Sequence, residues 1–191
     1  EVRIPEGTIY EPTFVRPGRG EAPQADSGVV VLSPAYRFFN PATPLFRAVE
    51  VTLRARVPRP LQLHAQLAVR TRRGSLACVG GAYADGAVTA SVRTAGDLVI
   101  VADTLPPAIR PLFAQGADLT RAEGVRFRAS DNFSGIASWT LHIDGEWVPC
   151  DRFPMKGTLV HFFDAPPQRR THAVRLSVTD GCGNTTHFEG T

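Results

Sequence analysis

The chain has 191 residues, 43% of them apolar, which is enough to build the core of one large domain or two small ones. Its formal net charge of +3 at pH 7 divides into +4 over residues 1–101 and −1 over residues 102–191, an excess too small to indicate nucleic-acid binding. No window of about 18 apolar residues occurs and the N-terminus lacks the basic and apolar regions of a signal peptide, so we expect no membrane span.

The first half of the sequence predicts a succession of strands. Apolar and polar residues alternate in 49–57 and 61–70, which puts Leu61, Leu63, Ala65, Leu67 and Val69 on one inner face. Pro58 and Pro60 between these runs cannot donate to a ladder and predict a turn. With the other apolar runs, the predicted strands fall in 8–15, 28–34, 49–57, 61–70, 75–81, 87–93 and 97–103. About seven strands in residues 1–102 predict a β-sandwich.

Prolines then interrupt this rhythm. Pro106, Pro107 and Pro111 predict a short, stiff linker around 102–111. After it, strict alternation resumes, and the predicted strands are 124–130, 136–144, 146–150, 158–163, 172–180 and 185–190. Residues 103–191 therefore predict a second sandwich, so the fold class is all-β with two antiparallel domains in tandem.

The stretch "SDNFSGIASWTLHIDGEW", residues 130–147, contains a corner and a hairpin. Asp131 and Ser134 are side chains that can accept backbone N–H bonds in a turn, and Gly135 supplies a positive φ. Asp144-Gly145 predicts a tight hairpin. We expect Trp139 and Trp147 to anchor it, with Trp147 in the core.

Two groups of polar residues are candidate metal ligands. Asp131, Asp180 and Asn184 lie in loops that could converge at one end of the second sandwich, and their oxygen atoms suit Ca²⁺. Bonding of these side chains to the backbone of their own turns is the favoured interpretation. His142 and Asp144 share one strand face, where polar residues are required in any case.

The three cysteines, Cys78, Cys150 and Cys182, stand too far apart for a CxxC metal motif. A bridge between Cys150 and Cys182 is one alternative, and free thiols in a β core are the commoner one. Cys182 lies between two glycines with no histidine dictated beside it, so we expect no nucleophilic catalysis.

A proline-broken loop in the second half is the best candidate for ligand contact. In "EWVPCDRFPMKG", residues 146–157, aromatic and cationic side chains stand together, a mixture that can stack on sugars or grip a peptide. The candidate binding residues are Trp147, Arg152, Phe153 and Lys156.

Residues 102–189 resemble a known family. The segments "ADTLPPAI", "FRASDNFSGIASWTLHIDGEWV", "KGTLVHFFD" and "HAVRLSVTDGCGN" are similar to the C-terminal immunoglobulin-like region of lysostaphin-type (LytM) zinc metallopeptidases of Bacteroidetes. A looser resemblance in the first half rests on "TIYEPTF", "SPAYRFFNPATPLF" and "GDLVIVAD". The resemblance to this family implies two tandem immunoglobulin-like sandwiches, an upstream peptidoglycan endopeptidase domain as partner, and export to the periplasm or cell exterior.

The resemblance does not bring the family's zinc site with it. That site needs an HxxxD and an HxH segment, and none of the five histidines, His64, His142, His161, His172 and His187, stands in either pattern. We therefore expect no catalysis and no cofactor in this chain, with zinc held only by a missing catalytic domain.

Three functions remain from these observations. The favoured one is a non-catalytic accessory tandem of a cell-envelope peptidoglycan endopeptidase, with peptidoglycan as a possible second partner. The alternative is a free-standing carbohydrate- or protein-binding adhesion module of the envelope, which predicts an accessible Trp147 or Phe153. An unrecognised hydrolase is the third, and it predicts a cleft with a perturbed titratable pair.

Overall fold

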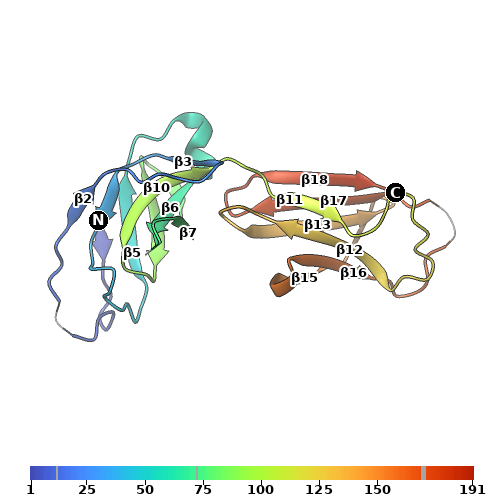
Figure 1. Cartoon of the computed structure of the whole chain (residues 1–191), viewed down its shortest axis with the longest axis horizontal. Helices are drawn as coiled ribbons and strands as arrows, with labels where there is room; N and C mark the ends of the chain where they lie inside the picture. The colour runs from blue at the N-terminus through green and yellow to red at the C-terminus, as the bar shows by residue number, and fades with distance from the viewer. Residues whose placement is uncertain (12, 72, 169–170) are drawn as a thin grey trace. The chain divides into compact units, whose positions relative to one another are not determined.

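The structure is a computed structural model, and it describes residues 1–11, 13–71, 73–168 and 171–191 (Figure 1). The chain divides into two compact units, Glu1–Leu105 and Pro106–Thr191. Each is an antiparallel β-sandwich, so the predicted all-β tandem is confirmed as a fold class. Among the described residues, no helix is long and apolar enough to cross a membrane.

The first unit has two sheets. One has the order β1-β5-β9-β8, formed by Val2–Arg3, Val49–Arg54, Ala87–Val92 and Ala82–Ala84. The other has the order β2-β4-β10-β6-β7, formed by Gly18–Gly20, Ala35–Arg37, Asp97–Asp103, Ala65–Arg70 and Leu76–Gly80. Strand β3, Val29–Val31, also pairs with β10.

The core of the first unit lies between its two sheets. Val51 of β5 and Leu67 of β6 are among the buried side chains that the two sheets turn toward each other. Ile100 of β10 belongs to the same cluster. Alternation specifies the buried face of β5, whereas β6 and β10 are buried on both faces over most of their length.

Two predicted strands of the first unit are wrong in whole or in part. Residues 8–11 and 13–15 form no strand: Thr8 instead closes a turn by donating its hydroxyl to the Pro5 carbonyl at 2.6 Å. Pro12 lies outside the described residues. Arg59–His64 is a 3-10 helix (η1) with proline in its first turn, where the missing N–H costs nothing. Leu63 is consequently 88% exposed instead of facing the core.

The second unit also has two sheets, each of four strands. One has the order β11-β12-β16-β15, formed by Ala108–Pro111, Gly124–Ser130, Thr158–Phe162 and Asp151–Phe153. The other has the order β14-β13-β17-β18, formed by Glu146–Val148, Ile136–Ile143, Val174–Asp180 and Thr185–Gly190. A 3-10 turn (η2), Pro154–Lys156, follows β15.

Aromatic rings fill the middle of the second unit. Phe127 of β12 is fully buried, and its ring meets those of Phe113 and Phe188 edge to face, with centroids 5.4 Å away in each case. Phe188 comes from β18 in the opposite sheet, so this contact joins the two layers. Leu141 and Leu176 complete the buried centre.

The connection between the units is shorter than the predicted linker. Residues 102 and 103 end β10, and Ala108–Pro111 form β11, which leaves 104–107 between them. Thr104 donates its backbone N–H and its hydroxyl to the Gly28 carbonyl in the first unit, at 2.8 and 2.9 Å. Pro107 accepts the Thr186 hydroxyl in the second unit. Both ends of the connection are thus tied to their own sandwiches.

Candidate functional site

The predicted binding residues do not form one surface. Trp147 lies on β14, whereas Arg152 and Phe153 lie on β15 and Lys156 in η2, next to the other sheet. The guanidinium of Arg152 already makes contacts within the second unit. It donates to the Ile136 carbonyl at 2.9 Å and lies 5.7 Å from the centre of the Trp139 ring. Phe153 and Lys156 are exposed.

The expectation that Trp147 belongs to the core is wrong. Its side chain is 64% exposed, because it pairs with His142 on the outer face of the β13–β14 hairpin. Trp139 is the partly buried indole of this sheet, and its Nε1 donates to the Cys150 carbonyl at 2.8 Å. The hairpin therefore presents one tryptophan outward and packs the other inward.

Trp147 stands at the edge of a polar sheet face that we call the tryptophan face. The strand registers place its side chains in three rows across β13, β17 and β18, all on the side opposite the core. Its members are Ser138, Thr140, His142, Trp147, Arg175, Ser177, Thr179, Thr185, His187 and Glu189. Ser177 bonds His187 Nδ1 and Thr179 bonds Thr185, each at 2.8 Å, so neighbouring strands hold these groups in place.

The residues predicted as calcium ligands lie close together, but their side chains accept backbone N–H groups of their own loops. Asp131 Oδ2 accepts the N–H groups of Phe133 and Gly135, while Asp180 Oδ1 accepts those of Cys182 and Asn184. The Asn184 amide donates to Asp180 Oδ2 at 2.8 Å. This is the turn bonding that the sequence favoured.

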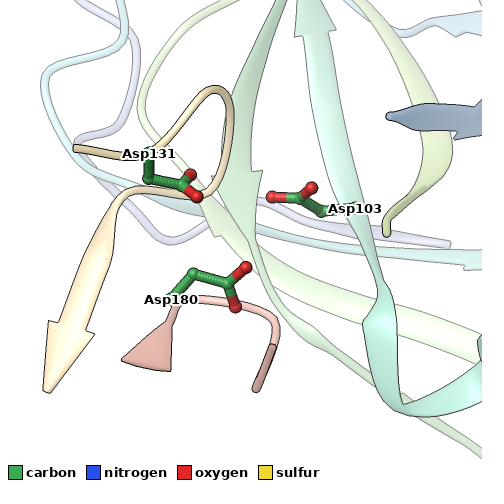
Figure 2. Close-up of side chains that lie close together, drawn as sticks. All are labelled: Asp103, Asp131 and Asp180. Carbon is green, nitrogen blue, oxygen red and sulfur yellow. The ribbon is translucent and has the colours of Figure 1, made fainter. Parts of the chain in front are cut away.

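The Asp131 and Asp180 carboxylates approach each other from the loops after β12 and β17 (Figure 2). A backbone bond of 2.9 Å from Gly181 to the Gly135 carbonyl joins these loops. Asp103, drawn in the same view, belongs to the first unit, where its Oδ1 accepts the Leu105 N–H at 3.3 Å. The second unit by itself therefore supplies a pair of carboxylates already engaged by backbone donors.

The end of the second unit remote from these loops contains a cleft of about 900 Å³. It is the open end of the space between the sheets: Val125 and His161 come from one sheet, and Ile143 and Val174 from the other. Among the described residues, its rim is formed by 116–120 before β12 and by residues within 163–168 and 171–172 after β16. Its further lining includes Phe113, Asp118, Leu119, Glu146, Val148, Phe163, Asp164, Gln168 and His172. We call this the inter-sheet cleft.

His161 is the polar side chain in the floor of the inter-sheet cleft. It occupies an inward-facing position of β16, opposite Val125, and is 9% exposed. Its Nδ1 lies 2.8 Å from the Pro149 carbonyl, which can only accept, so Nδ1 carries the proton. In the neutral ring this leaves Nε2 as a hydrogen-bond acceptor.

A hydrogen-bonded pair, Asp144 and His172, closes one side of the cleft. Asp144, at the hairpin tip with φ 52°, accepts from His172 Nδ1 at 2.8 Å and from the Ala173 N–H at 2.9 Å. His172 Nε2 lies 3.2 Å from the Gln168 carbonyl, a second acceptor. Only a ring that carries a proton on each nitrogen could donate to both acceptors. Asp144 therefore bonds His172 and the Ala173 N–H, whereas His142 lies on the outer face of the sheet opposite Trp147. The two side chains do not act together as metal ligands.

The three cysteines are free, so Cys150 and Cys182 are not bridged. Burial, reinforced by the charge of Asp151, raises the pKa of the Cys150 thiol to about 11. Cys150 is therefore protonated at neutral pH and a poor nucleophile.

Comparison with known protein families gives a family match for the first unit. Residues 1–103, more than half of the chain, match the Zu5-like domain. The chain belongs to the Zu5-like domain family. The match coincides with the first sandwich and ends with the last residue of β10, so the tryptophan face and the inter-sheet cleft lie outside the Zu5-like region. No curated protein matches the chain.

Sequence reasoning identified Trp147 but missed the inter-sheet cleft. The cleft is lined by segments from 113 to 174 that come together only in the folded sandwich. The sequence of β16, TLVHF, does not alternate, so only its register with β12 places His161 at an inward position.

Proposed function

We propose that the chain is a non-catalytic accessory tandem of a cell-envelope peptidoglycan endopeptidase, exported to the periplasm or cell exterior, which holds the substrate for a separate LytM-type catalytic domain. The resemblance of residues 102–189 to the region that follows such domains supports this partner. The observation that carries the proposal is the exposed Trp147, which lies on the same sheet face as the bonded hydroxyl and imidazole groups of β17 and β18. A flat aromatic surface flanked by hydrogen-bonding groups suits a glycan.

The chemistry of the second unit favours binding over catalysis. Both oxygens of Asp180 accept hydrogen bonds within its own loop, and both ring nitrogens of His172 face acceptors. The Cys150 thiol is held in its neutral form by its raised pKa. Groups engaged in this way are poor candidates for general bases or nucleophiles.

Trp147→Ala should weaken retention of the chain on insoluble peptidoglycan about tenfold or more, because a tryptophan is commonly among the few side chains that supply most of the binding energy of a contact. The measurement is the fraction of purified chain pelleted over a range of peptidoglycan amounts, repeated at high salt. Stacking on sugars should survive salt that screens charge contacts.

Phe162→Ala is the matched control, since Phe162 is 45% exposed but lies on β16 of the other sheet. Phe153→Ala should also retain binding for the same reason. Equal loss in all three variants, or undiminished retention of Trp147→Ala, would contradict the role of the tryptophan face.

The alternative function is a free-standing carbohydrate- or protein-binding adhesion module, which the exposure of Trp147 also favours. Adding the chain to a LytM-type catalytic domain acting on insoluble peptidoglycan separates the two. The accessory role predicts faster release of soluble fragments, abolished by Trp147→Ala, whereas an adhesion module leaves the rate unchanged.

A further inference from the structure

We propose that the outer face of the sheet β11-β12-β16-β15 binds the surface of a lipid bilayer that carries anionic headgroups. Its side chains come from the strand positions that point away from the core of the second unit. We call it the arginine face, and its main members are Arg110, Leu112, Arg126, Arg128, Phe153 and Phe162. The tryptophan face belongs to the other sheet of the sandwich, so the proposal goes beyond the accessory function and does not rest on it.

The strand registers bring three arginines together on this face. Arg110 of β11 is directly opposite Arg128 of β12, and Arg126 stands two residues before Arg128 on the same side of β12. Neighbouring strands lie about 4.8 Å apart, and alternate residues of one strand about 7 Å apart. The three guanidinium side chains therefore leave the backbone close to one another.

Two of these charges are uncompensated within the protein. Arg110 and Arg128 are exposed, and neither has a hydrogen-bond or ion-pair partner among the described residues. Arg126 lies 3.4 Å from the exposed Glu123, and the acidic Asp151 is on the edge strand β15, beyond β16. Like charges directly opposite each other on adjacent strands repel. An anionic headgroup between Arg110 and Arg128 offsets this repulsion and accepts hydrogen bonds from both guanidinium groups.

Exposed apolar side chains lie among the arginines. The Leu112 N–H donates to the Arg126 carbonyl at 2.8 Å, which continues the ladder and places Leu112 beside Arg126. Phe153 of β15 shares a register row with Arg128, and Phe162 lies farther along β16 on the same side. All three apolar side chains are exposed. Basic groups that reach headgroup phosphates, next to apolar groups that enter the boundary of the acyl chains, are typical of surfaces that lie on anionic membranes.

A bilayer fits this face better than a soluble anion does. A membrane presents many phosphates in one plane, so a flat sheet face can engage its three arginines at the same time. Each basic residue near an anionic membrane strengthens binding by about fivefold. A soluble phosphate could pair with the arginines, but it would leave the apolar side chains in water. The combination of charge and apolar exposure therefore favours the lipid surface.

Flotation of the full chain with lipid vesicles tests the proposal. Vesicles of phosphatidylglycerol and phosphatidylcholine in equal parts should bind the chain about tenfold or more strongly than vesicles of phosphatidylcholine alone at low salt. Added salt should weaken this preference, because it screens the headgroup charge. Inorganic phosphate at constant ionic strength should not displace the chain from the anionic vesicles.

Arg110→Gln and Arg128→Gln should each weaken binding to the anionic vesicles about 3- to 5-fold, and the double variant about tenfold or more. Phe162→Ala should weaken it about threefold or more through the loss of apolar insertion. Arg93→Gln is the matched control, because it removes the same charge from an exposed position of the first unit. Thermal unfolding and retention on peptidoglycan should be unchanged in the two single arginine variants.

Phe162→Trp reports which face meets the lipid. Brominated lipids in the anionic vesicles should quench the fluorescence of the added tryptophan, whereas the native Trp139 and Trp147, in the other sheet, should stay bright. The proposal is overturned if the chain does not prefer anionic vesicles, if Arg93→Gln weakens binding as much as Arg128→Gln, or if bound Phe162→Trp is not quenched. Displacement by inorganic phosphate, or equally strong binding to soluble polyglutamate that survives Phe162→Ala, would also overturn it in favour of a soluble anion or an acidic chain.

Discussion

Phe127→Ala should destabilise the second unit by about 3–5 kcal/mol, enough to leave it largely unfolded at moderate temperature. The ring of Phe127 is fully buried and touches the rings of Phe113 and Phe188, so its removal leaves a cavity between the sheets. The first unit has its own core cluster, which contains no residue of the second. Scanning calorimetry should therefore show the transition of the first unit unchanged and that of the second shifted sharply down.

Phe162→Ala is the control for this experiment, because Phe162 belongs to the neighbouring strand β16 but is 45% exposed. Its loss should cost well under 1 kcal/mol, as is usual for surface substitutions. A calorimetric trace in which Phe127→Ala lowers both transitions equally would contradict the assignment of separate cores to the two units.

The strands that sequence predicted best are those of the second unit. In β12, Val125, Phe127 and Ala129 alternate with arginine and serine residues, and all three are buried as expected. In β17, Val174, Leu176 and Val178 are buried in the same way. A strand with one buried face fixes its own register through this alternation, so local pattern is sufficient.

Local pattern was insufficient where a chain segment had no strand partner or began with proline. Residues 8–15 are rich in β-branched and aromatic residues, yet the Thr8 hydroxyl bonds the Pro5 carbonyl and Phe14 is fully exposed. Leu61 and Leu63 continue the pattern of β6, but the prolines before them start a 3-10 turn. Periodicity reports which residues would share a face if a strand formed, and whether it forms depends on pairing elsewhere.

Trp147 and His161 show the same limit at the candidate sites. The local context of Trp147 suggested a core position and His161 was given no role outside the zinc patterns, whereas the structure exposes Trp147 and buries His161. Which face of β14 turns outward follows from its pairing with β13, and the inward position of His161 follows from its register with Val125. The cleft exists because side chains fill the inter-sheet space at the centre of the sandwich and leave it open at one end.

Cys150 should react with iodoacetamide at least tenfold more slowly than a free cysteine at pH 8. Burial and the nearby Asp151 charge disfavour the thiolate and raise its pKa from 9.0 to about 11, which lowers the thiolate fraction about 100-fold. The greater nucleophilicity of a more basic thiolate recovers about tenfold of this. Mass spectrometry of cysteine-containing peptides follows Cys150 separately from Cys78 and Cys182.

The alkylation rate of Cys150 should depend on pH in the direction set by its raised pKa. Because the neutral thiol is the favoured form in the folded unit, the rate should rise about tenfold per pH unit from 7 to 10 without levelling. Asp151→Asn removes the repelling charge and should increase the rate at pH 8, whereas Glu189→Gln, on another strand, should not. A plateau below pH 9.5 in protein that circular dichroism shows to be folded would mean that Cys150 is an ordinary exposed thiol. A persistent rise would confirm that its sulfur is held neutral beside the Trp139 anchor, whose indole bonds the Cys150 carbonyl.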